Sequence, residues 1–217
     1  MNKVIIIFVE GDTDEEFYKR LISIIKSKCN NDFKQFNISK VHIINLEGIG
    51  NAKDRAIRLF DKLKKDINKA SKKVSKIEKV DYYVFFSYDT DIFKYSKKPA
   101  VNWDLVKKDF KGKCKKVYLI AAEEAIEDWF LFDIEGICNF LNLDKKYRNK
   151  SYKGIKDLEK LFDASNKTYV KGHTTKKFIE SLDVEKILTS ICKDICCLCE
   201  EIGFCKDKNF CKKDIYK

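Results

Sequence analysis

The sequence has only one proline and eight glycines in 217 residues. Disordered and low-complexity chains are commonly rich in such residues and poor in apolar ones. Here hydrophobic residues make up 44% of the chain, enough to form a buried core, and 36% of the residues are charged. The composition therefore argues against a disordered chain, and the length suits one large domain or one domain with a helical appendage.

Long apolar runs are also missing. Only six apolar residues separate Lys3 from Glu10, fewer than a signal peptide or a membrane span needs. We therefore expect no association with a membrane and a cytoplasmic location. In that reducing compartment the nine cysteines would be thiols, metal ligands or core residues, and not disulfides.

No dense basic run stands out, although the chain as a whole is basic. Lysine and arginine number 45 against 34 acidic residues, which gives a formal charge of +11. A field of this sign favours polyanions, of which nucleic acid is the commonest. Lysine is spread evenly, as an A+T-rich coding genome would also produce, so the charge alone fits nucleic-acid binding and a merely lysine-rich composition equally well.

Apolar runs alternate with amphipathic stretches up to residue 121. We predict strands over 3–9, 41–46, 80–87 and 116–121, and helices over 12–29, 52–68 and 104–110. From Glu123 onward the pattern is helical throughout. This order predicts an α/β fold with an open, mainly parallel sheet of about four strands and helices on both faces. We assign residues 1–133 to this domain and 134–217 to a helical C-terminal extension packed on it.

Acidic residues follow three of the predicted strands. Glu10 comes after the first, Asp89 after the third and the cluster 123–127 after the fourth. In open α/β sheets this edge binds ligands, and carboxylates that converge repel one another unless a cation compensates them. The sequence therefore predicts a metal site, with the carboxylates of Glu10, Asp89 and Asp91 within roughly 8 Å of one another.

The first motif, Val-Glu-Gly-Asp-Thr-Asp at 9–14, lies at a strand-turn-helix junction. Gly11 permits a tight turn and a close approach of phosphate to the backbone, and the helix start supplies amide donors. Glu10 would project from the strand end into the site. The alternative is an exposed Glu10 followed by residues, Asp12 to Asp14, that only cap the helix.

The second motif is Asp89-Thr90-Asp91. In an extended chain the two aspartates project to the same side, so both can reach one hard cation. Magnesium suits such oxygen ligands and keeps waters for substrate phosphates. The alternative is an acidic turn that closes the strand.

A hydrophobic strand ending in Glu-Gly-x-x-Asp/Glu, with a later strand ending in Asp-x-Asp, resembles the TOPRIM superfamily, which includes topoisomerases, bacterial primases and OLD-family nucleases. The resemblance spans roughly residues 3–133 and is carried by Glu10, Gly11, Asp14, Asp89 and Asp91. It implies a TOPRIM-type, Rossmann-like fold, a glutamate acting as acid/base or ligand, and aspartates that hold magnesium, or manganese, for phosphodiester chemistry.

The segment 121–133, which contains Glu-Asp-Trp at 127–129, resembles the third acidic motif of small stand-alone TOPRIM proteins associated with phage defence, including OLD-like systems. The resemblance implies that Glu127 is the third acid and Trp129 a packing residue. Glu124 competes with Glu127, because the two are three residues apart and share a helix face. A helix with one acidic face would explain the same residues without a function.

The resemblance also implies a lysine that neutralises developing phosphate charge, as cationic clamps do. Lys171, in a turn-like stretch of the tail, matches this role. Four other lysines compete with it: Lys153, Lys167, Lys176 and Lys177. His173 is a candidate base, but a lone histidine near a turn is more often structural.

The tail is rich in cysteine, at Cys192, Cys196, Cys197, Cys199, Cys205 and Cys211. Cys196 and Cys199 have Cys-x-x-Cys spacing, and Cys205 or Cys211 would complete a zinc site. A second Cys-x-x-Cys is absent, and several of these cysteines continue one apolar helical face. Core packing is therefore favoured over zinc.

The sequence Gly-Ile-Gly-Asn at 48–51 follows the second predicted strand. It could cradle a phosphate, but two glycines are a weak signal and a plain connecting loop is favoured.

These patterns predict a magnesium-dependent nuclease, with Glu10, Asp14, Glu127 and Lys171 catalytic and with Glu10, Asp89, Asp91 and Glu127 as metal ligands. One alternative is a catalytically weak module that binds nucleic acid or a partner such as an ATPase. Another is a phosphatase with Asp89 as nucleophile, although this leaves the Glu10 motif unexplained. The patterns do not distinguish DNA from RNA and leave the oligomeric state open.

Overall fold

The computed structural model of the chain describes residues 2–28, 36–72, 80–90, 101–123, 125–170 and 175–204. Four strands form one sheet: β1 (Asn2–Val9), β2 (Ile38–Asn45), β3 (Val80–Asp89) and β4 (Lys116–Ala122). All neighbouring strands are parallel, and their order is β2-β1-β3-β4. The predicted α/β fold with an open parallel sheet of four strands is confirmed.

The two central strands are the most apolar. In β1 every side chain from Val4 to Val9 is buried, because helices cover both faces of the sheet. The edge strands β2 and β4 are only partly buried. β2 also begins earlier than predicted, since Ile38 pairs with Lys3 of β1.

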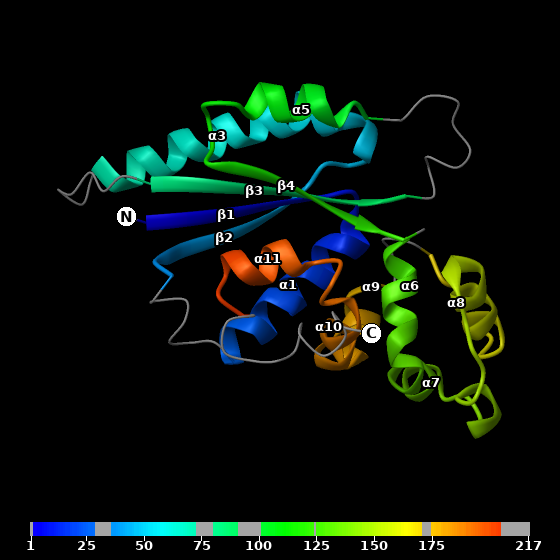
Figure 1. The fold of residues 1–217 in the computed structure, drawn as a ribbon. Helices are drawn as coiled ribbons and strands as arrows, with labels where there is room; N and C mark the ends of the chain where they lie inside the picture. Colours follow the sequence, from blue (N-terminus) through cyan, green and yellow to red (C-terminus); the bar gives the residue numbers. More distant parts are fainter. Residues whose placement is uncertain are drawn as a thin grey trace, which may run out of the picture.

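Helices cover the sheet on both faces (Figure 1). On one face lie α3 (Ala52–Lys72) and α5 (Trp103–Phe110). The 3-10 turn η1 (Ile49–Asn51) joins α3 to β2, and α5 lies between β3 and β4 in the chain. On the other face lie α1 (Asp12–Lys28) and the C-terminal helices. These are α6 (Ile126–Phe130), α7 (Ile134–Leu141), α8 (Gly154–Asp163), α9 (Thr175–Ser181), α10 (Val184–Ile191) and α11 (Cys196–Glu201), with 3-10 turns η2 (Leu131–Asp133) and η3 (Lys145–Tyr147).

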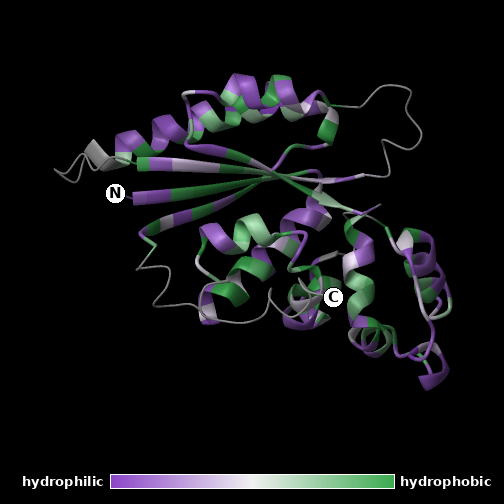
Figure 2. Ribbon diagram, in the orientation of Figure 1, coloured by the Kyte–Doolittle hydropathy of each residue, from purple (hydrophilic) through white to green (hydrophobic). Residues whose placement is uncertain are grey.

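Alternate residues of the strands belong to two different hydrophobic clusters, one on each face of the sheet. Ile7 and Val9 belong to the cluster under α1, whereas Ile6 and Phe8 belong to the one under α3. In Figure 2 the central strands carry much hydrophobic (green) colour, and the outer side of α3 is largely hydrophilic (purple). On the inner face of α1, Phe17, Leu21 and Ile25 are fully buried, and Ile24 packs at the margin of the cluster.

The C-terminal helices share the core of the sheet domain. A single cluster joins residues of β1 and α1 with Phe178 of α9, Leu198 of α11 and others along the tail. At the far end of the sheet, Lys3 Nζ donates to Glu201 Oε2 at 2.6 Å and so ties α11 to β1. The predicted helical tail therefore packs closely on the α1 side of the sheet.

Two of the tail cysteines are core residues. Cys192 and Cys199 are buried, and Cys199 lies in the cluster under α1. Cys196 is partly exposed, and its thiol donates to Glu200 Oε1 at 3.4 Å. Cys205 and Cys211, which the zinc hypothesis needs, lie outside the described residues. Within those residues no helix is both long and apolar enough to cross a bilayer.

Candidate active site at the carboxyl edge of the sheet

Glu10 and Asp89 lie at the same edge of the sheet. Phe8 of β1 pairs with Phe86 of the parallel strand β3, and continuing this register would bring Glu10 level with Tyr88. For a spacing between strands of about 4.8 Å, the Cα atoms of Glu10 and Asp89 are then about 6 Å apart. Both acids thus stand at the carboxyl ends of the central strands, where α/β sheets bind ligands.

The backbone around Glu10 is held by β2 and the turn after it. The Glu10 carbonyl accepts a hydrogen bond from the Gly48 amide at 2.8 Å. Beside it, Asp12 Oδ1 accepts from Asn45 Nδ2 at 2.6 Å. Gly48 has φ of +105°, a conformation that favours glycine. Since its amide serves the Glu10 carbonyl, the 48–51 turn acts as a structural brace, in line with the plain-loop interpretation.

Asp14 is buried in the first turn of α1, with 1% of its surface exposed. A Cβ atom on Gly11 would lie 3.7 Å from Asp14 Oδ2, so the carboxylate packs against the turn that follows β1. One helical turn further on, the Tyr18 hydroxyl donates to Ser87 Oγ on β3 at 2.9 Å. Burial raises the pKa of Tyr18, and the nearby charge of Asp14 raises it further.

Glu127 is fully buried at the start of α6 and is held by Tyr169. The Tyr169 hydroxyl donates to Glu127 Oε1 at 3.0 Å. Burial raises the pKa of Tyr169 most, the charges of Glu127 and Asp14 raise it further, and a hydrogen bond with Thr13 opposes the shift. Tyr169 therefore remains a protonated donor between α1 and α6.

Asp89, at the end of β3, is 2% exposed. Its Oδ1 accepts a hydrogen bond from the Ile126 amide at 3.0 Å. This bond joins the end of β3 to the first turn of α6, next to Glu127. Because Phe85, Ser87 and Asp89 alternate along β3, all three face α1.

A buried polar cluster thus lies at the carboxyl edge. The structure has six buried polar or charged residues among those described, and five belong here: Thr13, Asp14, Ser87, Asp89 and Glu127. The sixth, Asp133, is a capping residue that accepts hydrogen bonds from the amides of Gly136 and Asp183. Buried polar groups therefore concentrate at one place, formed by β3, α1 and α6.

The structure brings Asp14, Asp89 and Glu127 into this cluster, whereas Glu10 is half-buried at the same edge of the sheet. Trp129 is buried, and the centroid of its ring lies 6.0 Å from that of the Phe17 ring, as expected for a packing residue. Asp91, Glu124, Lys171 and His173 lie outside the described residues. The cluster, as far as the structure describes it, therefore includes neither Asp91, the second aspartate of the motif, nor Lys171.

The donors suit a hard divalent cation in type, because carboxylate oxygens are the ligands that magnesium prefers. In number they fall short: the described part of the chain has no group of three or more His, Cys, Asp or Glu side chains arranged to hold a metal. A site with Asp89 as one ligand would need a further ligand such as Asp91.

Sequence reasoning did not find Tyr18, Ser87 and Tyr169. Tyr18 carries a local signal, since it is four residues after Asp14 on one face of α1. Tyr169 carries none, because its contact with Glu127 bridges 42 positions and depends on how the C-terminal helices fold back.

Asp128 has a structural role beside the cluster. Its Oδ1 accepts from the Gly154 amide at 2.6 Å and its Oδ2 accepts from the Ala125 amide at 3.3 Å. It therefore ties the start of α6 to the start of α8 and fixes the direction in which Glu127 enters the core.

No protein-family model, no curated protein and no solved structure matches this chain.

Proposed function

We propose that the chain is a metal-dependent phosphodiesterase that cleaves nucleic acid at the carboxyl edge of the sheet. The observation that carries the proposal is the concentration of buried acids there, with Asp14, Asp89 and Glu127 each at most 2% exposed. Glu10, Asp14, Asp89 and Glu127, which belong to the motifs that resemble the TOPRIM superfamily, stand at this edge. The formal charge of +11 favours a polyanionic substrate.

Energetics support a functional reason for the cluster. Burying a carboxylate costs several kcal/mol unless donors or a cation compensate it. The fold supplies donors to two of the acids, from Tyr169 to Glu127 and from the Ile126 amide to Asp89. Three acids gathered at one buried place would not serve stability alone.

The residues take different roles in this proposal. Glu10 is the most accessible of the four acids and would face the substrate as acid/base or ligand. Asp89, together with Asp91, would hold magnesium or manganese. Glu127 and Asp14, which are buried, would add to the negative electrostatic potential at these ligands. Such an ion, when bound, supplies charge neutralisation for the phosphodiester and for attacking water.

Purified protein incubated with plasmid, single-stranded DNA and tRNA, each with magnesium, manganese or EDTA, tests the proposal. We expect cleavage of at least one substrate with metal and none with EDTA. Glu10→Gln and Asp89→Asn should each lower the rate at least 100-fold. Asp54→Asn, an exposed acid at the start of α3 on the opposite face, is the matched control and should retain the full rate.

The alternatives give different results. A module that only binds nucleic acid would bind the substrates but leave all three uncut with either metal. It would also leave them uncut after addition of any ATPase encoded beside it. A phosphatase would release phosphate from a small monoester and spare the polymers. Its nucleophile would be Asp89, whose burial and hydrogen bond to the Ile126 amide disfavour direct attack.

A further inference from the structure

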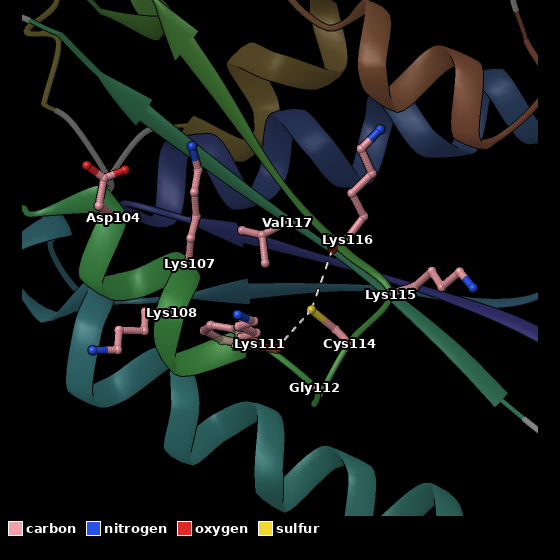
Figure 3. Close-up of a pocket in the computed structure, with 10 residues that line it drawn as sticks. Asp104, Lys107, Lys108, Lys111, Gly112, Cys114, Lys115, Lys116 and Val117 are labelled. Carbon is pink, nitrogen blue, oxygen red and sulfur yellow. Dashed lines mark hydrogen bonds between the residues drawn. The ribbon is translucent and has the colours of Figure 1, made fainter.

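A basic pocket lies between α5 and the start of β4, away from the acidic edge (Figure 3). Its volume is about 600 Å³. Five lysines line it: Lys107, Lys108, Lys111, Lys115 and Lys116. Asp104 is the single acidic residue in its lining, so the lining carries a formal charge of +4 from five lysines and one aspartate.

These lysines are exposed and available to a ligand. Among the residues that the structure describes, none of the ion pairs involves any of the five. Lys113, in the same loop but outside the pocket lining, does pair, with Asp61 at 3.3 Å. The loop therefore has a carboxylate within reach of Lys113, whereas none of the ion pairs among the described residues neutralises a pocket lysine. The Lys116 ammonium lies 4.4 Å from the centre of the Tyr118 ring.

Each half of the pocket has an ordinary structural explanation. Lysines in the last turn of α5 complement the helix dipole, and lysines on an edge strand such as β4 prevent pairing with other chains. Neither explanation accounts for both sets lying around one hollow. Figure 3 shows Lys107 and Lys111 beside the hollow on the α5 side, whereas the side chains of Lys115 and Lys116 extend from β4 away from it.

We propose that this pocket binds the sugar-phosphate backbone of a nucleic-acid strand. In Figure 3 the ammonium groups of Lys107, Lys115 and Lys116 do not converge on one point, which favours an extended polyanion over a single small anion. Lysine ammonium groups act as point charges towards phosphate and impose no base sequence. The surface would therefore hold a strand in place without reading it.

The pocket and the acidic edge lie at opposite ends of β4. The strand begins at Lys116 in the pocket and ends at Ala122, which pairs with Asp89. Six residue steps at about 3.3 Å give roughly 20 Å. With one phosphate of each strand per 3.4 Å of duplex axis, a double-stranded substrate would need about six base pairs to reach both. This reach rests on the proposed function, whereas binding in the pocket does not.

Binding is tested in EDTA, where no metal-dependent cleavage occurs, with a fluorescent 24-nucleotide single strand at several salt concentrations. Lys107→Gln/Lys111→Gln should lower the slope of log affinity against log salt by about 1.4, because each phosphate contact on a single strand contributes about 0.7. Affinity at 0.15 M salt should fall about tenfold. Lys145→Gln/Lys150→Gln removes the same charge from exposed lysines near η3 and should leave the slope unchanged.

Equal slopes for the wild type and the pocket variant, or equal losses in both double variants, would overturn the proposal. Thermal melting of each variant checks that it is folded. The proposed function is judged separately, by cleavage with magnesium. If the pocket variant loses affinity while the wild type cleaves nothing, the pocket stands and the nuclease fails. If the wild type cleaves and the slopes are equal, the nuclease stands and the pocket fails.

Discussion

At the scale of single residues, the contact that most affects the candidate site is the hydrogen bond between Tyr169 and Glu127. Tyr169 is 6% exposed, and its hydroxyl lies 3.0 Å from Glu127 Oε1. It positions the carboxylate and need not touch the substrate. Burial raises the pKa of its hydroxyl, so it stays a donor above the pH at which an exposed tyrosine ionises.

Tyr169→Phe should destabilise the protein by about 1–3 kcal/mol, because a buried acceptor loses its donor. If Glu127 contributes to catalysis, the pH profile of cleavage should also shift upwards, since Glu127 without its donor protonates more easily. Tyr152→Phe removes a partly buried hydroxyl that donates to the Tyr147 carbonyl and is the control. A profile that shifts equally in both variants would show that Tyr169 acts only through stability.

The buried tyrosines also predict how stability changes at high pH. Burial raises the pKa of both Tyr18 and Tyr169 above the usual value near 10. Above pH 10 the unfolded chain loses these protons while the folded chain keeps them, so stability is complete below pH 10 and falls as the pH rises. Each group contributes about 1.4 kcal/mol per pH unit.

Urea unfolding at pH 9, 10 and 11 measures this effect. The decline in unfolding free energy above pH 10 should be shallower in Tyr18→Phe, by about one group's share. An unchanged slope in that variant would mean that Tyr18 ionises as readily in the folded chain as in the unfolded one.

At the scale of elements, strands and helices of the sheet domain could be predicted because each has its own period. β3 begins at Val80 and α3 at Ala52, as expected, since apolar runs and a helical face are local patterns. The ends were less predictable. α3 continues to Lys72 instead of 68, and β2 starts at Ile38 instead of 41, because pairing with β1 extends the strand beyond its apolar part.

Asp133 shows how the short C-terminal helices are joined. It is the N-cap of α7, accepting from the Gly136 amide, and it also accepts from the Asp183 amide at 2.8 Å, before α10. Lys186 of α10 lies 3.3 Å from its Oδ1. One buried carboxylate thus holds two helices that are distant in the sequence.

Asp133→Ala should therefore lower the unfolding free energy by about 2–4 kcal/mol, from a lost cap and an unsatisfied buried amide. Asp144→Ala is the matched control, because Asp144 stands before η3 without a side-chain cap and is exposed; it should cost less than about 1 kcal/mol. Urea unfolding compares them, and similar losses in both would contradict the bracing role of Asp133.

At the scale of the whole molecule, the C-terminal helices complete the core on the α1 side. Residues of β1 and α1 share one cluster with residues of α9 and α11. A chain ending at residue 133 would lose α9 and α10, which pack on α1, and each buried apolar side chain that this exposes would cost about 1.5–3 kcal/mol. Because domains are stable by only about 5–15 kcal/mol, this fragment should not fold cooperatively.

Circular dichroism during heating tests this expectation. The complete chain should melt in one transition, and the fragment 1–133 should show none. A fragment with a cooperative transition would instead make 1–133 an independent domain and 134–217 an appendage, as the sequence pattern suggests.

The sequence by itself determined the alternation of strands and helices, the parallel sheet and the edge at which Glu10 and Asp89 stand. These follow from local periodicity and from the rule that parallel strands end at one edge. Only the tertiary structure decided that Tyr169 holds Glu127, that Tyr18 reaches Ser87 and that Asp133 serves as a brace. These contacts join residues that lie far apart in the sequence, and they depend on how α1 packs on the sheet and how the C-terminal helices fold back. Such packing is a property of complementary surfaces that no local pattern in the chain encodes.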